Sequence, residues 1–306
     1  MKPLTTSTLK VVAATCWVLC CGAGQFAHAT EVDSFTNRNA VFVDATPALD
    51  AQMNRRIDQA IKRTNKIGTC DAHLLYFEMG VSLRAGLLGA FMVSPLENYS
   101  NWSGKVDRNK TRRRNSIYKD LTIIESPPIA LYPLGALILV NGQLIAGDKF
   151  SHFLNVGWTY YQIHHRKGQP VSEALAYGEK TEEGIWGLAT TGIYSYADLA
   201  ANFSGMRFWT SVLGEEDPLG LNTEPLVKCV EGRWERQLEF TWADWVDPGW
   251  DEGINCNKYA PRVERNVSSG VVCPVDPTRC ARVVALYGKY ADRLVSPECR
   301  SVNAVP

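Results

Sequence analysis

Apolar positions recur every three or four residues along several stretches of the chain, a spacing typical of amphipathic helices. The clearest stretch follows Thr46-Pro47, a pair with the residue types of a helix start. The apolar repeat there is Leu49, Met53, Ile57 and Ile61. The spacing predicts helices over residues 46–68, from 69 or 71 to about 89, and over 148–165, 171–189, 197–212 and about 279–294.

Signals for β-structure are short. Leu137–Val140 and Gln143–Ala146 flank Asn141-Gly142, a dipeptide that favours the type I′ turn of a β-hairpin. The polar stretch 97–119 predicts an exposed loop, and beyond Pro218 the periodicity breaks up among Trp, Pro and Gly. The expected fold is therefore mainly α: a helical core with a small β-hairpin and a disulfide-braced, loop-rich C-terminal region.

The N-terminal segment has the pattern of a secretory leader. Lys2 and Lys10 precede an apolar run over 11–23, and Ala27-His28-Ala29 is a small-x-small cleavage signal. We therefore expect a signal peptide over 1–29, a helical core domain with a polar cleft over 30–217, and a Cys/Trp-rich C-terminal region over 218–306 packed on that core. The expected location is periplasmic or secreted, in a bacterium. No later apolar run is long enough to span a membrane.

Composition narrows the possible classes of protein. Hydrophobic residues make up 45% of the chain and charged residues 21%, which is typical of a globular protein and excludes a disordered chain. Lys and Arg total 32, as do Asp and Glu, so no overall positive field favours nucleic acid. Nucleic acid is therefore not an expected partner.

Cysteine spacing predicts disulfides rather than a metal or redox motif. Of nine cysteines, three lie in the leader, and the remaining six include no C-x-x-C pair. Five crowd the last eighty residues, so Cys70 must reach that region if all six pair. Fifteen pairings are formally open. The expected local bridge joins Cys273 and Cys280.

Short polar side chains line one side of the predicted helix at 148–165. On a regular helix Asp148, His152, Asn155, Thr159 and Gln162 form one stripe. A solvent-facing stripe normally carries Lys, Glu and Arg, so this pattern predicts that the helix is buried and faces an internal cleft.

Two further segments carry paired polar groups. Glu182 and Glu183 lie on the helix predicted at 171–189. Asp198 and Asn202 lie one turn apart on the next predicted helix, followed by Gly205, where a second backbone could approach closely. The three helices are expected to surround one pocket. A purely structural interpretation also exists: Asp148 is at a helix N-cap position, and Ser195-x-x-Asp198 matches a capping box.

The motifs around Asp148 and Asp198 resemble a pattern found in other proteins. Asp-Lys-x-x-His-Phe from Asp148, a following glutamate, and Ser-x-x-Asp-Leu-x-x-Asn-x-x-Gly from Ser195 resemble a pattern in exported bacterial proteins of uncharacterised function and, more remotely, in VanZ-like membrane proteins. The resemblance covers 147–209, about a fifth of the chain. It implies a shared helical core built on Asp148, His152, Glu182, Asp198 and Asn202, and it implies no reaction.

The polar groups suit acid–base chemistry. Hydrolysis of a glycosidic or ester bond needs an acid and a base, which Glu182 with Asp198 or Asp148 would supply, with His152 as a proton carrier. A metal-dependent enzyme is an alternative, in which His152 and two of the carboxylates are ligands. The cofactor is left unknown. The motifs G-x-S-x-G, GxGxxG and the P-loop are absent from the sequence.

Aromatic residues flank the polar pairs, and flat aromatic faces suit sugar rings. The expected substrate-binding residues are Asn202, Trp158, Tyr161, Trp186, Tyr196 and Arg207. The leading prediction is an exported hydrolase acting on a cell-envelope glycan. Another periplasmic ligand remains open, and the non-catalytic alternative is an envelope protein that binds glycan or a protein partner.

Overall fold

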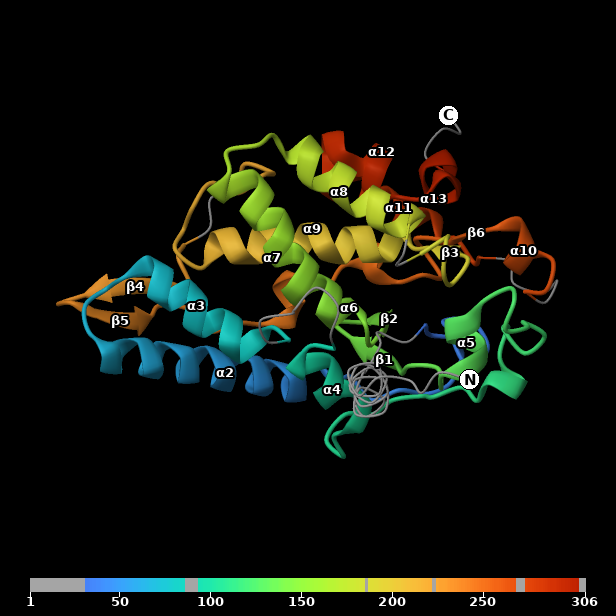
Figure 1. The fold of residues 1–306 in the computed structure, drawn as a ribbon, viewed down its shortest axis with the longest axis horizontal. Helices are drawn as coiled ribbons and strands as arrows, with labels where there is room; N and C mark the ends of the chain where they lie inside the picture. The colour runs from blue at the N-terminus through green and yellow to red at the C-terminus, as the bar shows by residue number, and fades with distance from the viewer. Residues whose placement is uncertain (1–30, 86–92, 185–186, 222–223, 268–272, 303–306) are drawn as a thin grey trace, which may run out of the picture.

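The chain folds mainly as α-helices, as its periodicity predicts (Figure 1). The computed structural model describes residues 31–85, 93–184, 187–221, 224–267 and 273–302; the predicted leader therefore lies outside the described residues. The α-helices outside the central run are α2 (Thr46–Ile67), α3 (Ala72–Leu83), α4 (Pro95–Trp102), α5 (Pro127–Leu131), α8 (Val171–Glu183), α9 (Tyr196–Ser211), α10 (Pro261–Glu264), α11 (Pro277–Tyr287), α12 (Ala291–Leu294) and α13 (Pro297–Ser301).

A central helical run combines α-helical and π-helical turns. Its parts are α6 (Lys149–Ser151), the π-helical η3 (His152–Val156), α7 (Gly157–Tyr161) and the π-helical η4 (Gln162–Arg166). Short 3₁₀ turns are η2 (Arg113–Asn115), η5 (Trp242–Asp244), η6 (Pro248–Trp250) and η7 (Gly288–Tyr290). The predicted helices at 46–68, 148–165 and 197–212 are confirmed within one residue at each end.

Two predicted helices are shorter than expected. The helix predicted at 171–189 ends at Glu183, because the chain turns back on itself and the Leu188 amide donates to the Glu182 carbonyl at 2.7 Å. A Cβ on Gly187 would lie 2.0 Å from that same oxygen, so glycine is required for this close approach. The helix predicted at 279–294 is interrupted at Gly288, whose φ of 51° ends α11.

The second predicted helix and the predicted loop differ in detail. Helix α3 begins after Asp71, whose side chain accepts from the Leu74 amide, and residues 86–89 of the prediction lie outside the described residues. The loop prediction for 97–119 is wrong at its start, where α4 runs to Trp102. Ser94 caps α4 by accepting from the Glu97 amide at 3.2 Å, a local signal that the polar composition concealed.

The strands form three antiparallel pairs. The predicted hairpin is confirmed as β1 (Leu137–Val140) and β2 (Gln143–Ala146), with positive φ at both turn residues, as a type I′ turn requires. The other pairs are β3 (Ile193–Tyr194) with β6 (Lys258–Tyr259), and β4 (Val227–Val230) with β5 (Arg233–Arg236).

Within the described residues, three disulfides brace the chain. Cys70 pairs with Cys229, which confirms that Cys70 reaches the C-terminal region. The predicted Cys273–Cys280 bridge is wrong: Cys256 pairs with Cys273, and Cys280 pairs with Cys299. Helix α11 packs against α13, so the buried Cys280 faces α13 rather than the segment before its own helix. Disulfides of this kind are typical of proteins from an oxidising compartment.

The main hydrophobic core contains side chains from both the predicted helical core and the C-terminal region. At its centre, the run α6–α7 crosses α9 (Figure 1). A Cβ on Gly157 would lie 2.6 Å from the Gly205 Cα, and a Cβ on Gly205 would lie 2.0 Å from the Phe153 carbonyl oxygen. The predicted close backbone approach at Gly205 is therefore confirmed, and it brings the two helices that carry His152 and Asp198 into direct contact.

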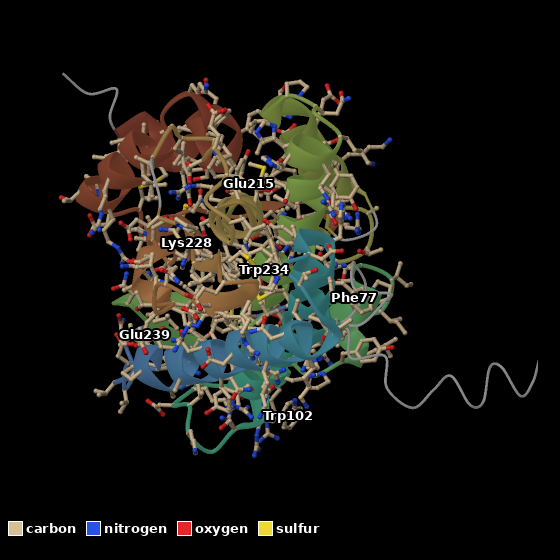
Figure 2. All side chains as sticks on the ribbon, turned by 90° about the vertical axis from the view of Figure 1, so that its left-hand side faces the viewer. Phe77, Trp102, Glu215, Lys228, Trp234 and Glu239 are labelled. Carbon is tan, nitrogen blue, oxygen red and sulfur yellow. A yellow bond between two sulfur atoms is a disulfide. The ribbon has the colours of Figure 1, made fainter. Side chains whose placement is uncertain are left out.

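No helix in the described ranges is both long and apolar enough to cross a membrane. Apolar side chains on the surface are mostly scattered; Phe77 on α3 and Trp102 at the end of α4 are examples (Figure 2). Scattered exposure of this kind is ordinary for a folded protein.

Candidate functional site

A buried lysine lies at the centre of the polar cluster. Hairpin β1–β2 leads directly into Asp148 and Lys149, which begin the central helical run. The Lys149 side chain is fully buried, and its Nζ lies 2.6 Å from Asp198 Oδ1, 2.8 Å from Glu252 Oε1 and 3.1 Å from Asp148 Oδ1. One ammonium group therefore joins carboxylates from three separate segments.

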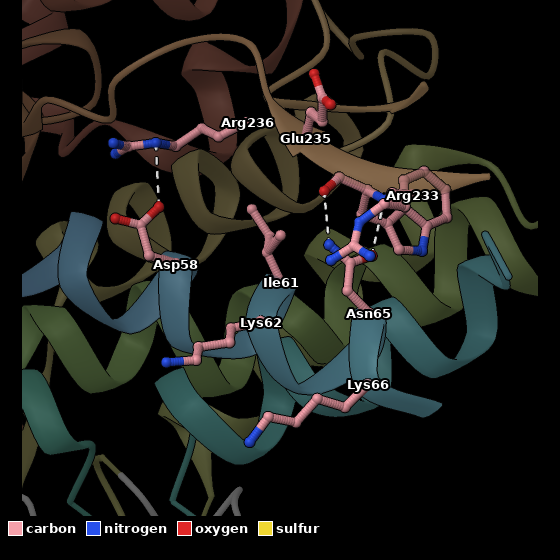
Figure 3. A pocket seen from close by; sticks show the side chains of 9 residues that line it. Asp58, Ile61, Lys62, Asn65, Lys66, Arg233, Glu235 and Arg236 are labelled. Carbon is pink, nitrogen blue, oxygen red and sulfur yellow. Dashed lines mark hydrogen bonds and ion pairs between the residues drawn. The ribbon is translucent and has the colours of Figure 1, made fainter. Parts of the chain in front are cut away.

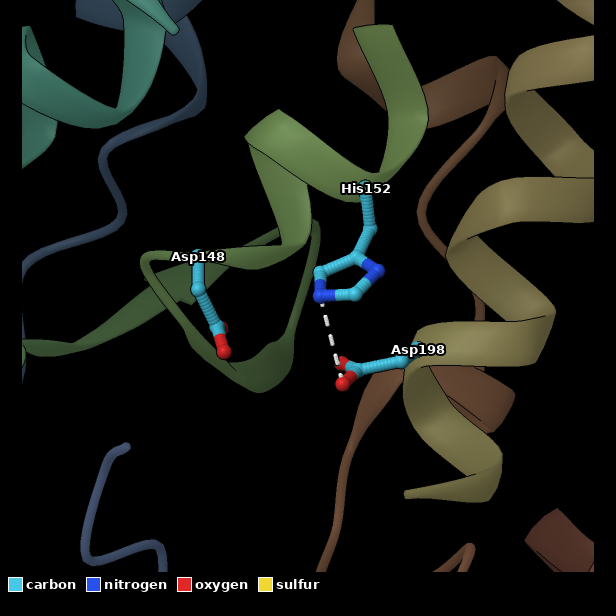
Figure 4. Close-up of side chains that lie close together, drawn as sticks. All are labelled: Asp148, His152 and Asp198. Atoms are coloured by element: carbon cyan, nitrogen blue, oxygen red, sulfur yellow. Dashed lines mark ion pairs between the residues drawn. The ribbon is translucent and has the colours of Figure 1, made fainter. Parts of the chain in front are cut away.

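His152 follows Lys149 by about one turn and faces α9 (Figure 4). Its Nε2 lies 3.2 Å from Asp198 Oδ2, and its Nδ1 lies 3.1 Å from Asn202 Oδ1. Asp198 and Asn202 are one turn apart on α9, as the sequence predicts. The side chains of His152, Asp198 and Asp148 retain 15%, 12% and 10% exposure.

The start of α9 shows that Asp198 serves this cluster rather than its own helix end. Ser195 Oγ accepts from the Asp198 amide at 3.1 Å, as in half of a capping box. In a complete box the Asp198 carboxylate would accept from the Ser195 amide. Here Glu182 accepts from that amide instead, at 3.3 Å, and Asp198 is left to Lys149 and His152.

Burial sets the charge state of the cluster. Burial raises the pKa of Glu182 well above its usual value, and the nearby Asp198 charge raises it further. Burial also raises the pKa of Asp148, an effect that the Lys149 ammonium partly offsets. For Lys149 burial acts to lower the pKa, but the surrounding carboxylates outweigh it and the pKa is raised well above the usual value. Lys149 is therefore charged, and burial favours the neutral form of Glu182.

Some cluster members were not predicted. Glu252 comes from the loop-rich C-terminal region, and its second oxygen accepts from Ser34 Oγ at 2.7 Å. Lys149 lies within the segment 147–209 that resembles other proteins, but the sequence predicts no role for it. Glu97 on α4 accepts from the Oγ of Ser151, the residue before His152. The capping pattern before Glu97 indicates the start of α4, but no sequence pattern indicates that Glu252 meets Lys149 or that Glu97 meets Ser151.

Several predicted substrate-binding residues lie in other surroundings. Trp158 and Tyr161 are buried in an aromatic stack with Tyr76, with Tyr76–Tyr161 and Trp158–Tyr161 centroid distances of 5.3 and 5.1 Å. Arg207 pairs with Asp217 at 2.9 Å. These three residues therefore present no free sugar-binding face or unpaired cation to the cluster.

Among the predicted aromatic residues, Tyr196 lies nearest in sequence to Asp198. It is partly exposed and packs edge-on against Tyr194, with ring centroids 5.0 Å apart. The carboxyl of Glu182 contributes to a raised pKa of Tyr194, although burial is the main cause. Trp186 lies outside the described residues.

The predicted polar stripe does not extend along the whole helical run. Asn155 Oδ1 accepts from the Ala85 amide at 3.2 Å, and Gln162 is exposed. The π-helical turns change the angular position of each later residue, so Thr159 and Gln162 do not continue the face of Asp148 and His152.

The cluster also has the residue types of a metal site. One ligand atom from each of Asp148, His152 and Asp198 can be chosen so that all three lie within 4.8 Å of one another. However, the Lys149 ammonium already contacts both carboxylates. A divalent cation here would face the charge of Lys149, so the set fits a resident metal poorly.

Comparison with family models, with curated proteins and with solved structures finds no match to this chain. The functional argument therefore depends on the geometry and chemistry of the cluster.

Glu97 makes stability depend on pH. Burial raises the pKa of Glu97 to about 8, with a further rise from Asp148 and a lowering from its bond with Ser151. A free glutamate titrates near pH ~4.3, so the folded state holds a proton that the unfolded state releases. Between these pH values the free energy of unfolding falls as pH rises, by up to ~1.4 kcal/mol per pH unit from this group. We expect Glu97→Gln to flatten that decline and to be more stable than wild type at pH 8 by on the order of 2 kcal/mol.

Urea unfolding at pH 5, 6.5 and 8 measures this effect. Glu173→Gln, at an exposed position of α8, is the matched control and should leave the pH slope unchanged. Equal slopes for Glu97→Gln and wild type would show that Glu97 is not held protonated in the folded protein.

Proposed function

We propose that this protein is an exported hydrolase that acts on a cell-envelope glycan, with Asp148, Asp198 and His152 as its catalytic residues. The observation that carries the proposal is the pair of carboxyl groups, Asp148 and Asp198, beside one imidazole, with 10–15% of each side chain exposed. Glycosidases use such a pair, in which one group is protonated and the other ionised.

The two carboxyl groups have different surroundings. Asp198 lies 2.6 Å from the Lys149 ammonium and 3.2 Å from His152 Nε2. The pKa of Asp148 is raised by burial, with the Asp198 charge as a further cause. Asp148 is thus suited to give a proton to a leaving oxygen, and Asp198 is suited to attack or to stabilise positive charge.

The separation of the carboxyl groups favours one stereochemical course. Their oxygens can lie within 4.8 Å of each other. Retaining glycosidases place the two groups about 5 Å apart, whereas inverting enzymes leave at least ~6.5 Å for a water molecule between acid and base. The proposed reaction therefore retains the anomeric configuration: Asp198 displaces the leaving oxygen as Asp148 protonates it, and water then releases the sugar.

The remaining buried groups position this pair. Lys149 fixes Asp198 and Asp148, while Glu182 holds the start of α9 through the Ser195 amide. Tyr196 is two residues before Asp198 on α9, a spacing that places the two side chains on different faces of the helix, so the proposal assigns it no part in binding the sugar. The leader pattern and the three disulfides support export.

A metal-dependent hydrolase is the second candidate, because Asp148, His152 and Asp198 can bring three ligand atoms together. It differs from the proposal in one measurable respect. A metal enzyme loses activity in a chelator and regains it when the metal is restored, whereas carboxylate chemistry is unaffected by a chelator.

The test is cleavage of purified peptidoglycan and a panel of envelope polysaccharides, followed as new reducing ends by mass spectrometry. We expect product from wild type in the presence of a chelator, and at least ~100-fold less from His152→Ala, which removes the imidazole that contacts Asp198. Circular dichroism and thermal melting check that the variant folds. Retention of a polysaccharide without cleavage would instead identify a non-catalytic binding protein.

A further inference from the structure

A second surface feature lies apart from this cluster, between α2 and the β4–β5 hairpin. A groove of about 500 Å³ lies there, and Figure 3 shows the side chains that line it. Its lining includes Lys62 and Lys66 from α2, and Arg233 and Trp234 from β5. None of the groups proposed for catalysis belongs to this lining.

The floor of the groove is held in place. Asn65 bonds the backbone of Trp234 in both directions, with its Nδ2 donating to the Trp234 carbonyl at 2.9 Å and its Oδ1 accepting from the Trp234 amide at 2.8 Å. Arg236 pairs with Asp58 at 3.2 Å across the same gap. The Cys70–Cys229 disulfide ties β4 to the chain that follows α2. A ligand would therefore meet a preformed surface.

The rim of the groove carries cations that have no carboxylate partner. Lys62 and Lys66 lie one helical turn apart on the same face of α2, and both are exposed, as is Arg233. Over the described ranges, no carboxylate lies within ion-pair distance of these three side chains. Glu235 also lines the groove, but Figure 3 shows its carboxylate extending away from the lysines.

The local charge differs from that of the whole chain. The chain has equal numbers of basic and acidic residues, yet the groove lining holds Lys62, Lys66, Arg233 and Arg236 against Asp58 and Glu235, an excess of two positive charges. The Trp234 indole N–H is also buried without a hydrogen-bond partner in the described structure. Donors and positive charge together favour a ligand rich in anionic oxygens.

We propose that this groove binds a linear anionic glycan, in which the repeating units carry carboxylate, sulfate or phosphate groups. Lys62 and Lys66 contact successive anionic groups along α2, and Arg233 contacts the chain from the opposite rim. The choice of a glycan over other polyanions rests on the proposed function. The groove then anchors a long substrate while another part of that chain is cleaved.

Calorimetric binding of hexameric oligogalacturonate tests the proposal, with neutral maltohexaose as the comparison ligand. We expect wild type to bind oligogalacturonate and not maltohexaose, and the affinity to fall as NaCl is raised from 25 to 300 mM, because exposed charges are screened. Lys62→Glu/Lys66→Glu and Arg233→Glu should each weaken binding at least ~10-fold. Lys105→Glu/Lys119→Glu makes the same charge change at exposed positions outside the groove and should leave the affinity within about twofold.

Each opposite result overturns the proposal. Such results are absence of binding by wild type, equal binding of maltohexaose, and equal binding by the Lys62→Glu/Lys66→Glu variant. Equal affinity for hexaglutamate would show that the groove accepts any polyanion and would remove the glycan assignment. Cleavage by Asp148 and Asp198 is scored separately on a short neutral substrate. Binding without cleavage would reject the hydrolase, and cleavage without groove-dependent binding would reject this inference alone.

Discussion

Replacing Lys149 by methionine is expected to lower the free energy of unfolding by at least ~4 kcal/mol at pH 7. The side chain is fully buried and is the shared cationic partner of Asp148, Asp198 and Glu252. Methionine fills similar space, but it leaves carboxylates without a counter-ion in a medium of low polarity. Removal of one partner from a buried ion pair typically costs ~3–5 kcal/mol, and here three groups lose their partner.

Urea unfolding measures the loss, with Lys180→Met as the control at an exposed position of α8. The loss should shrink between pH 7 and pH 5, because carboxyl groups in the variant can bind protons instead of remaining charged. Adding Glu252→Gln to Lys149→Met should recover part of the stability. If the single variant does not fold, the double variant is measured in its place. A loss below ~1 kcal/mol would show that Lys149 does not neutralise the cluster.

The sequence predicted the parts of this site that depend on one or two helices. Asp148 and His152 share a face, as do Asp198 and Asn202, because spacing of four residues has the same meaning in any regular helix. The glycine at position 205 predicted the close crossing of the two helices. Helical spacing alone therefore predicted that the histidine, the two aspartates and the asparagine belong to one site.

The parts that the sequence did not predict depend on contacts between distant segments. Glu252 follows a stretch without periodicity, and its meeting with Lys149 is purely tertiary. The π-helical turns η3 and η4 shift later residues around the helix, which a regular repeat does not anticipate. The aromatic prediction for Trp158 and Tyr161 had the same weakness, since residue type alone does not separate a core stack from a binding face.

Asp198 and Asp148 are expected to respond differently to substitution by asparagine. Asp198→Asn removes the attacking carboxylate and should lower kcat at least ~1000-fold on every substrate. Asp148→Asn removes the proton donor, which matters only when the leaving oxygen is strongly basic. Asp148→Asn should therefore lose at least ~100-fold in kcat/KM on the natural glycan but retain most of kcat/KM on an aryl glycoside of the same sugar, whose phenolate leaves without a proton. Its kcat on the aryl glycoside should fall, because Asp148 is also the base that activates water in the second step.

Glu182→Gln is the matched comparison. Burial raises the pKa of Glu182 well above its usual value, which favours its neutral form, and glutamine keeps its shape and the carbonyl that accepts from the Ser195 amide. Its kcat should stay within about threefold of wild type, which separates a positioning role from proton donation. A large loss in Glu182→Gln, together with equal losses for Asp148→Asn on both substrates, would assign the acid to Glu182.

The course of the reaction supplies an independent check. Proton NMR of the first-formed sugar should show a retained anomeric configuration, because Asp148 and Asp198 lie about as close together as the two carboxyl groups of retaining glycosidases. A slow-leaving fluorinated substrate should trap a glycosyl ester on Asp198, which peptide mass spectrometry locates. Inversion, or labelling of another residue, would reject this pair as nucleophile and acid, even if the protein cleaves glycans.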